Sequence, residues 1–255
     1  MVETVVIDVV QSDAAGTSNN TNVPFTTLPS GNETFDVSIE ALDAQSGQEL
    51  HVWLPFSMGV DITATAVGPT VAVRSLEGGV TVNSPAGLVE LQSMKGGNVN
   101  VTTDTGNVIC TSLQGNIRIV TRGGLIDVGK VQALDCTLIS NTGTIRARAI
   151  YANKTEVQSS SGNITLGAIH GDSAIDSGSG NVTIGTAEGK VVVKTEAGDI
   201  SVHLNACKAA TLQSSTGEVA VSFLEDQEAT IRFDVGPGGT VSSTVPIDGL
   251  PALST

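Results

Sequence analysis

From Pro69 onward, hydrophobic and polar residues alternate in short runs, and most runs begin with a glycine. The second and fourth residues after each start are almost always apolar, whereas the first, third and fifth are mostly polar. Alternation of this kind is typical of a β-strand with one buried face. The starts recur every 9 or 10 residues between Pro69 and Gly217, which indicates a repeat architecture.

Successive runs differ where they end. In every other run the seventh residue after the start is apolar, as in Leu76 and Leu113, whereas in the runs between it is polar or small, as in Asp104 and Asn141. The repeating unit is therefore a pair of runs, 18–19 residues long. Stacked pairs predict an all-β fold, a parallel β-solenoid of about eight coils. The crossover rule favours a right-handed β-helix. Six positions after the start, most runs have Ser or Thr, and we expect these small residues to turn inward where the coil narrows.

The aromatic residues suggest where the repeat ends. Tyr151 is the only one inside the repeat. A narrow interior has little space for rings, whereas the exposed ends of a sheet need to be covered. We therefore predict three parts: an acidic N-terminal β cap over residues 1–66, the β-solenoid repeats over residues 67–222, and a C-terminal cap and tail over residues 223–255.

The charge distribution limits the partners. The net charge is −14, and residues 1–66 contain nine Asp and Glu but no Lys or Arg. Such a chain repels phosphate backbones, so we expect no nucleic-acid partner. No apolar run reaches the roughly 18 residues of a membrane span. Met1 is not followed by a secretory signal, which favours an intracellular protein. A mitochondrial or cell-surface protein remains the alternative if the chain is truncated.

No motif indicates a cofactor or a metal. The cysteines, Cys110, Cys136 and Cys207, are odd in number and widely spaced, as expected of reduced, buried thiols. The histidines lack a neighbouring His or Cys and are His51, His170 and His203. The segment from Gly185 to Val191 imitates a phosphate-binding loop, but its spacing is one residue short and Val191 follows the lysine. We expect no cofactor, no metal ion and no catalytic residue.

Outward-facing residues at the same place in successive coils should form rows. Asp135, Lys154, Asp172 and Lys190 share one such place, and Asp127 and Arg146 share another. Rows with alternating charge support the strand register. Val120 and Ile139 should lie side by side and face outward, which makes them the candidate partner surface.

Three stretches resemble a known family: "LPFSMGVDITA", the serial glycine-led units, and "EATIRFDVGPGGTVSS". They resemble the adhesin-like β-solenoid domains of uncharacterised bacterial and eukaryotic proteins over roughly residues 50–245, and most of all the animal members. The resemblance implies the fold and an adhesin-like role, and it implies no catalytic residues.

The sequence thus predicts a non-enzymatic scaffold that binds an unknown protein or glycan on one sheet face. Two alternatives remain. A polysaccharide-active β-helix enzyme would need acids and bases that converge in a cleft, with Asp127 as the residue to test. A purely structural assembly domain would instead have its end-to-end stacking blocked by acidic caps.

Overall fold

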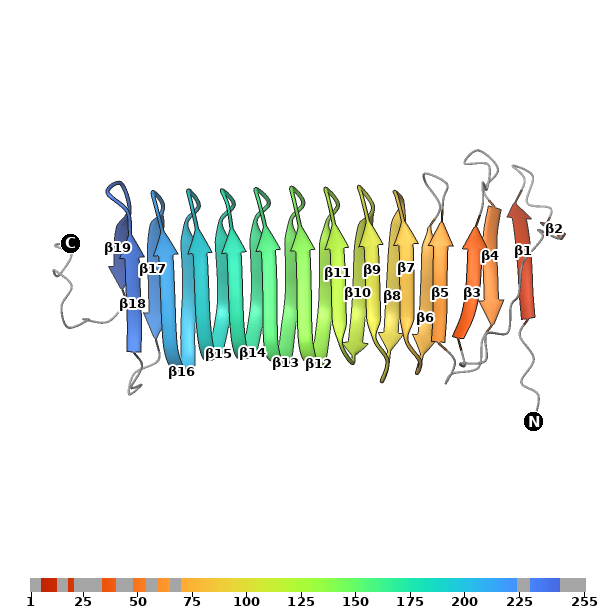
Figure 1. The fold of residues 1–255 in the computed structure, drawn as a ribbon, viewed down its shortest axis with the longest axis horizontal. Helices are drawn as coiled ribbons and strands as arrows, with labels where there is room; N and C mark the ends of the chain where they lie inside the picture. The colour runs from red at the N-terminus through yellow and green to blue at the C-terminus, as the bar shows by residue number, and fades with distance from the viewer. Residues whose placement is uncertain are drawn as a thin grey trace.

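The chain builds one long ladder of parallel strands (Figure 1). The computed structural model describes residues 6–12, 18–20, 34–39, 48–53, 59–64, 70–223 and 230–243. These residues form 19 β-strands, and no helix occurs among them. The predicted all-β parallel β-solenoid is confirmed, with about nine turns, close to the predicted number of coils.

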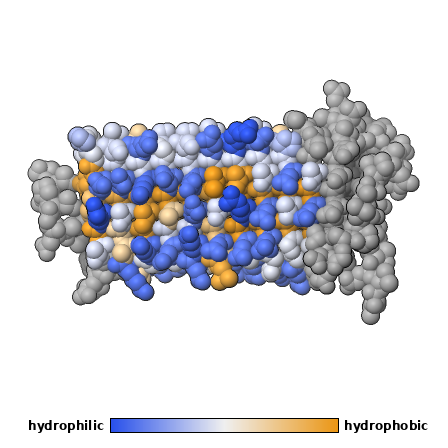
Figure 2. Space-filling model, viewed as in Figure 1, coloured by the Kyte–Doolittle hydropathy of each residue, from blue (hydrophilic) through white to orange (hydrophobic). Residues whose placement is uncertain are grey.

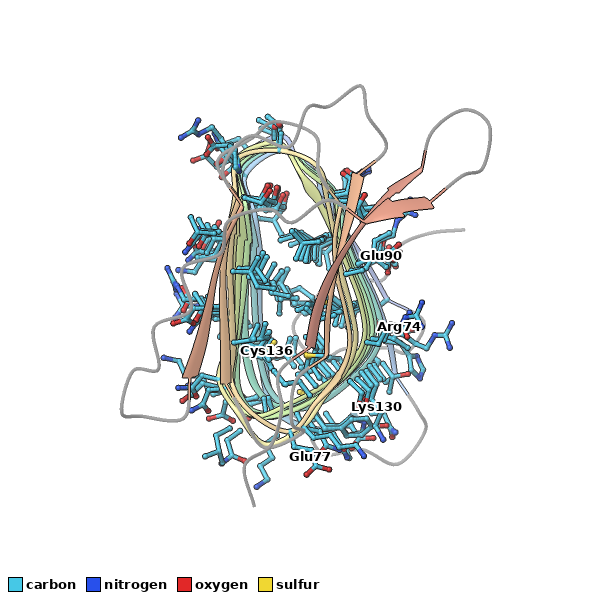
Figure 3. The ribbon with its side chains drawn as sticks, turned by 90° about the vertical axis from the view of Figure 1, so that its right-hand side faces the viewer. Arg74, Glu77, Glu90, Lys130 and Cys136 are labelled. Carbon is cyan, nitrogen blue, oxygen red and sulfur yellow. The ribbon has the colours of Figure 1, made fainter. Side chains whose placement is uncertain are left out.

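The ladder winds into two parallel sheets that face each other across the core (Figure 3). The front sheet, which faces the viewer in Figure 1, begins with β3 (Thr34–Ile39), β5 (Gly59–Ala64), β7 (Val80–Ser84), β9 (Val99–Thr103) and β11 (Ile117–Thr121). The rear sheet begins with β6 (Val71–Leu76), β8 (Leu88–Met94) and β10 (Asn107–Gln114). From residue 126 on, one strand of each coil runs through both sheets: β12 (Ile126–Ser140), β13 (Ile145–Ser159), β14 (Ile164–Ser177), β15 (Val182–Thr195) and β16 (Ile200–Ser214).

Strands outside residues 67–222 also join this ladder. At one end, β17 (Glu218–Phe223) crosses the predicted boundary and pairs in parallel with β16. Beyond it, β18 (Thr230–Val235) pairs in parallel with β16, and β19 (Thr240–Ser243) pairs with β17. At the other end, β3 and β5 pair in parallel and lead to β7. A separate antiparallel sheet consists of β1 (Val6–Ser12), β2 (Ser18–Asn20) and β4 (Gln48–Trp53). The predicted division into two caps and a repeat region stays a prediction, and the ladder extends through both of its boundaries.

The core consists of straight rows of side chains that follow the ladder. Where each coil passes from the rear sheet to the front sheet, the buried row is hydrophobic, and we call this the apolar bend. Its members are Leu76, Met94, Leu113, Val131, Ile150, Ile169 and Ala187. Glu77 and Lys130 lie outside this bend, at the lower edge of Figure 3, while Cys136 points into the core from the front sheet.

At the opposite bend the buried row consists of hydroxyl-bearing residues, and we call this the hydroxyl bend. Its members are Ser84, Thr103, Thr121, Ser140, Ser159, Ser177, Thr195 and Ser214. The predicted inward turn of small residues is therefore confirmed here, whereas Ser75, at the equivalent place of the apolar bend, is exposed. In the coil of Ser140, the hydroxyl oxygen accepts a hydrogen bond from the N–H of Gly143 at 2.9 Å. A Cβ atom on Gly143 would lie 1.9 Å from the carbonyl oxygen of Gly124, so this close stacking of coils requires glycine.

Candidate functional site

Val120 and Ile139 lie where the sequence predicts them. They are direct neighbours in the register of β11 and β12, and their side chains are half-buried on the outer surface of the front sheet. Their row continues with Thr102 on one side and Gln158 on the other. Figure 2 shows hydrophobic atoms at the middle of this row, with hydrophilic atoms further along it. Val120 and Ile139 are therefore two apolar residues within an otherwise polar row.

The pair lines an open groove of about 770 Å³ between the end of the front sheet and the hydroxyl bend. The groove crosses several coils and therefore runs along the solenoid axis. One wall is the row of Val120, and the other is formed by residues that follow the bend. The lining residues are Thr102, Thr103, Asp104, Val120, Thr121, Arg122, Ile139, Ser140, Asn141, Gln158, Ser159, Ser160, Asp176, Gly178 and Glu196.

The charges of this groove are more acidic than basic. Asp104 and Arg122 form an ion pair with a nearest N–O distance of 3.4 Å. Both side chains are largely exposed, so the pair contributes little to stability. Asp176 lies beside Lys194 in the register of β14 and β15, and Glu196 follows on the same rim. The lining thus contains three carboxylates and one guanidinium, and it favours a cationic group over an anionic one.

The hydroxyl groups in the floor of the groove are already used by the fold. Thr121 accepts a hydrogen bond from the N–H of Gly124 at 3.0 Å, and Ser159 accepts one from Gly162 at 2.9 Å. An activated hydroxyl nucleophile needs an adjacent general base within hydrogen-bond reach. The partners of these hydroxyls are backbone groups instead, so the floor of the groove holds the bend together.

The thiols are free and buried, as predicted. Burial raises the pKa of the Cys110 thiol to about 12, with a smaller contribution from the nearby carboxylate of Asp127. Burial likewise raises the pKa of Cys136 to about 12, and it raises the pKa of Cys207. Because the thiolate is the nucleophile and the metal ligand, these cysteines are structural rather than reactive. Among the residues that the structure describes, no group of three His, Cys, Asp or Glu side chains is placed to hold a metal ion.

One cluster on the apolar bend escaped the sequence prediction. The rings of Tyr151 and His170 are stacked, with centroids 4.4 Å apart and planes 13° apart. His170 donates a hydrogen bond through Nδ1 to Glu188 at 2.8 Å, and Asn205 donates to the same carboxylate at 3.1 Å. The sequence offered one signal, because these residues recur at 17 to 19 positions, the length of one coil.

The predicted charged rows are present in part in the register. Lys154 lies between Asp135 and Asp172 on successive coils, and all three side chains are exposed. Lys190 has Ala209 as its neighbour in the next coil. Asp127 and Arg146 are neighbours on the rear sheet. Asp127 lines neither the groove described above nor the hollow beside Tyr151. The carboxylate named for the alternative of a polysaccharide-active enzyme therefore lies on a sheet surface.

Two facing parallel sheets wound from one chain define the protein as a β-solenoid. The family model described as Toastrack DUF4097 matches residues 112–246, which is more than half of the chain, and the chain belongs to this family. The match supports the resemblance to a β-solenoid family of uncharacterised function. A comparison with curated proteins found no match, and a comparison with solved structures found none either. Within the described part of the chain, no helix has the length and apolar content that a membrane crossing needs.

Proposed function

We propose that the protein is a non-enzymatic scaffold that binds an extended segment of a partner protein in the groove beside the hydroxyl bend. The observation that carries this proposal is the apolar pair Val120 and Ile139, half-exposed at the middle of a groove with polar rims. Burying such a pair against an apolar side chain stabilises a complex by roughly 25 cal/mol per Å² of apolar surface removed from water.

The groove also indicates the chemistry of the segment. Neighbouring coils of a ladder are about 4.8 Å apart, so the step from Ile139 to Asp176, two coils on, is about 10 Å. An extended chain rises about 3.4 Å per residue, so three residues span this distance. We propose a segment with an apolar residue over Val120 and Ile139 and a basic residue about three positions away, near Asp176 and Glu196. The adhesin-like role belongs to this proposal.

The absence of enzymatic activity is part of the same proposal. It is supported by the raised pKa values of the cysteines and by the hydroxyls that hold the hydroxyl bend. It is tested with a panel of polysaccharides, assayed with the wild-type protein and with the variant Asp127→Ala. Cleavage by the wild type that Asp127→Ala abolishes would replace this proposal with the polysaccharide-active enzyme.

Binding is tested by selecting displayed random peptides on the wild-type protein. The test variant is Val120→Thr/Ile139→Gln, which gives both positions the residue types of their own row, Thr102 and Gln158. The matched control is Ile109→Thr, which removes an apolar side chain that is 39% exposed on the rear sheet. Selected peptides should share an apolar and a basic residue. The test variant should bind these peptides at least about tenfold more weakly than the wild type, whereas the control should bind them as the wild type does. Equal binding by all three proteins would contradict the proposed groove.

A further inference from the structure

A second hollow lies outside the apolar bend. Two of the three large hydrophobic side chains that are exposed in the described part of the chain line it. Leu134 is 63% exposed and Tyr151 is 42% exposed. Both line an open hollow of about 480 Å³. The full lining is Gly96, Gly97, Asn98, Gly115, Asn116, Gln132, Ala133, Leu134 and Tyr151. None of these side chains is charged, although the chain as a whole carries a net charge of −14.

The aromatic wall of this hollow is held in place from behind. His170 stacks on one face of the Tyr151 ring, and Glu188 accepts the hydrogen bond of His170. Asn205 donates to the second oxygen of that carboxylate. The cluster spans four successive coils, so the ring is fixed in orientation before any ligand arrives. A fixed ring binds with a smaller loss of side-chain entropy than a mobile one.

The second face of the Tyr151 ring is turned toward the earlier coils, which line the hollow. His170 belongs to the coil that follows Tyr151, whereas Gln132 belongs to the coil before it and lines the hollow. Because the ring is stacked on the later coil, its other face looks toward the earlier coils. The ammonium of Lys130 lies over the ring, 5.7 Å from its centroid, at the outer limit of a cation–π contact. The Lys130 side chain is exposed, and it has to move aside for a ligand ring to stack on this face.

The floor of the hollow is backbone. Gly96 and Gly115 have positive φ angles of 82° and 122°, and neither presents a side chain to the hollow. Leu134 stands where the preceding coils have Gly97 and Gly115, so it projects beside a flat floor. A ring-shaped ligand can therefore lie on the glycines with one edge against Leu134.

The polar groups of the hollow are amides. The side chain of Asn116 donates to Asn98 at 3.3 Å, and Gln114 donates to Gln132 at 3.0 Å. Each primary amide has two donor hydrogens and an acceptor oxygen with two lone pairs, so these pairs retain further hydrogen-bonding capacity. Amides can donate to and accept from hydroxyl groups without carrying charge. The hollow thus offers an apolar wall, an aromatic face and neutral hydrogen-bonding groups together.

We propose that this hollow binds a neutral sugar ring, as part of a glycan. The polarised C–H bonds on one side of a pyranose suit the electron-rich face of Tyr151, and its hydroxyl groups suit Asn98, Asn116 and Gln132. The lining itself contains no charged side chain, while the ammonium of Lys130 lies 5.7 Å from the centroid of the Tyr151 ring. This site lies on the opposite bend from the proposed peptide groove, and the two proposals stand or fall separately.

The test is saturation-transfer NMR with a panel of neutral methyl pyranosides and their oligosaccharides. The neutral sugars should give signal transfer with the wild-type protein. Tyr151→Ala should weaken binding about tenfold, because it removes the central aromatic contact, whereas Tyr151→Phe should retain it within about threefold. Leu134→Asn, which supplies the residue that the next coil has at this place, should also weaken binding.

Two controls keep the result interpretable. Val120→Thr/Ile139→Gln alters only the groove at the other bend and should bind the sugars as the wild type does. Thermal unfolding of each variant shows whether the coil is intact, and Leu134→Asn serves if Tyr151→Ala unfolds. Absence of signal transfer from every neutral sugar would overturn the proposal. Sugar binding that both Tyr151→Ala and Leu134→Asn leave unchanged would overturn it too.

Discussion

At the hydroxyl bend the chain turns on buried Ser and Thr side chains that contact the backbone, whereas at the apolar bend it turns around buried hydrophobic side chains. In six coils the Ser or Thr oxygen of the hydroxyl bend accepts a hydrogen bond from the glycine three residues later. Hydrogen bonds are directional, while hydrophobic contacts are not. The two bends therefore constrain the backbone to different degrees.

The difference is visible in the strand register. The register shifts in the ladder lie at or next to the apolar bend: one follows Tyr151 between β13 and β14, and the others lie between β15 and β16. Ala206, the one residue other than glycine with a positive φ angle among the described residues, also lies there, with φ of 49°. Nondirectional packing permits bulges that re-aim side chains, and such bulges often lie beside functional sites. The lack of directional hydrogen bonds at the apolar bend is therefore consistent with the register shifts and the positive φ angle of Ala206 found there.

The largest effect should come from a glycine of the hydroxyl bend. Gly143→Ala places a Cβ atom 1.9 Å from the carbonyl oxygen of Gly124, so neighbouring coils must separate. We expect the free energy of unfolding to fall by about 4 kcal/mol or more. Gly123→Ala is the control, because its nearest atom would be the Thr142 hydroxyl at 3.4 Å, and it should change stability by less than about 1 kcal/mol. Urea unfolding measures both. Equal losses would show that the backbone relaxes at this bend as well.

The next effect tests the packing of the apolar bend. Ile150 is fully buried, and Ile150→Ala should lower the free energy of unfolding by about 2–5 kcal/mol through lost burial and a residual cavity. The matched change on the surface, Ile109→Ala, should cost less than about 1 kcal/mol. Thermal unfolding with calorimetry distinguishes the two. A loss at Ile150 as small as that at Ile109 would mean that the bend collapses around the missing atoms.

A smaller effect tests the hydrogen bonds of the hydroxyl bend. Ser140→Ala removes the acceptor of the Gly143 N–H, and an unsatisfied buried donor costs about 1–3 kcal/mol. Ser75→Ala, at the equivalent exposed place of the apolar bend, should change stability by less than about 0.5 kcal/mol. Urea unfolding of both variants measures the two changes in the free energy of unfolding. If the two substitutions had the same effect, the contrast between directional and nondirectional bends would not hold.

The smallest effect concerns the charged row beside the apolar bend. The variant Asp135→Ala/Asp172→Ala leaves Lys154 without carboxylates on either side, and exposed pairs contribute about 1 kcal/mol at most. We expect a small loss of thermal stability that disappears at high salt. A loss several times larger, unaffected by salt, would show that this row fixes the register that the apolar bend leaves loose.

The parts of the molecule that follow from a regular period were predictable. The inward rows, the neighbouring positions of Val120 and Ile139, and the placement of Lys154 between two aspartates all depend only on counting residues from one coil to the next. The buried thiols follow from the same count, because Cys110 and Cys136 occupy inward positions. Period and hydropathy together determine which face of each strand is buried.

The features that depend on three-dimensional detail were not predictable. The runs have Ser or Thr six positions after their start at both bends, yet these turn inward only at the hydroxyl bend. Tyr151 and His170 are neighbours in the register, just before a register shift, but the stacking of their rings depends on side-chain orientations that counting residues does not give. The parallel pairing of β18 and β19 with the ladder is a property of the backbone path, and the strand pattern alone suits a cap equally well.

The stacking of coils also determines how the molecule carries load. The backbone hydrogen bonds between coils run along the solenoid axis, and each coil contacts only its neighbours. A pulling force on the two ends of the ladder therefore loads the coil interfaces in series, so the weakest interface opens first and the others remain closed. We therefore expect the molecule to lengthen in discrete steps, each of which opens one interface between neighbouring coils.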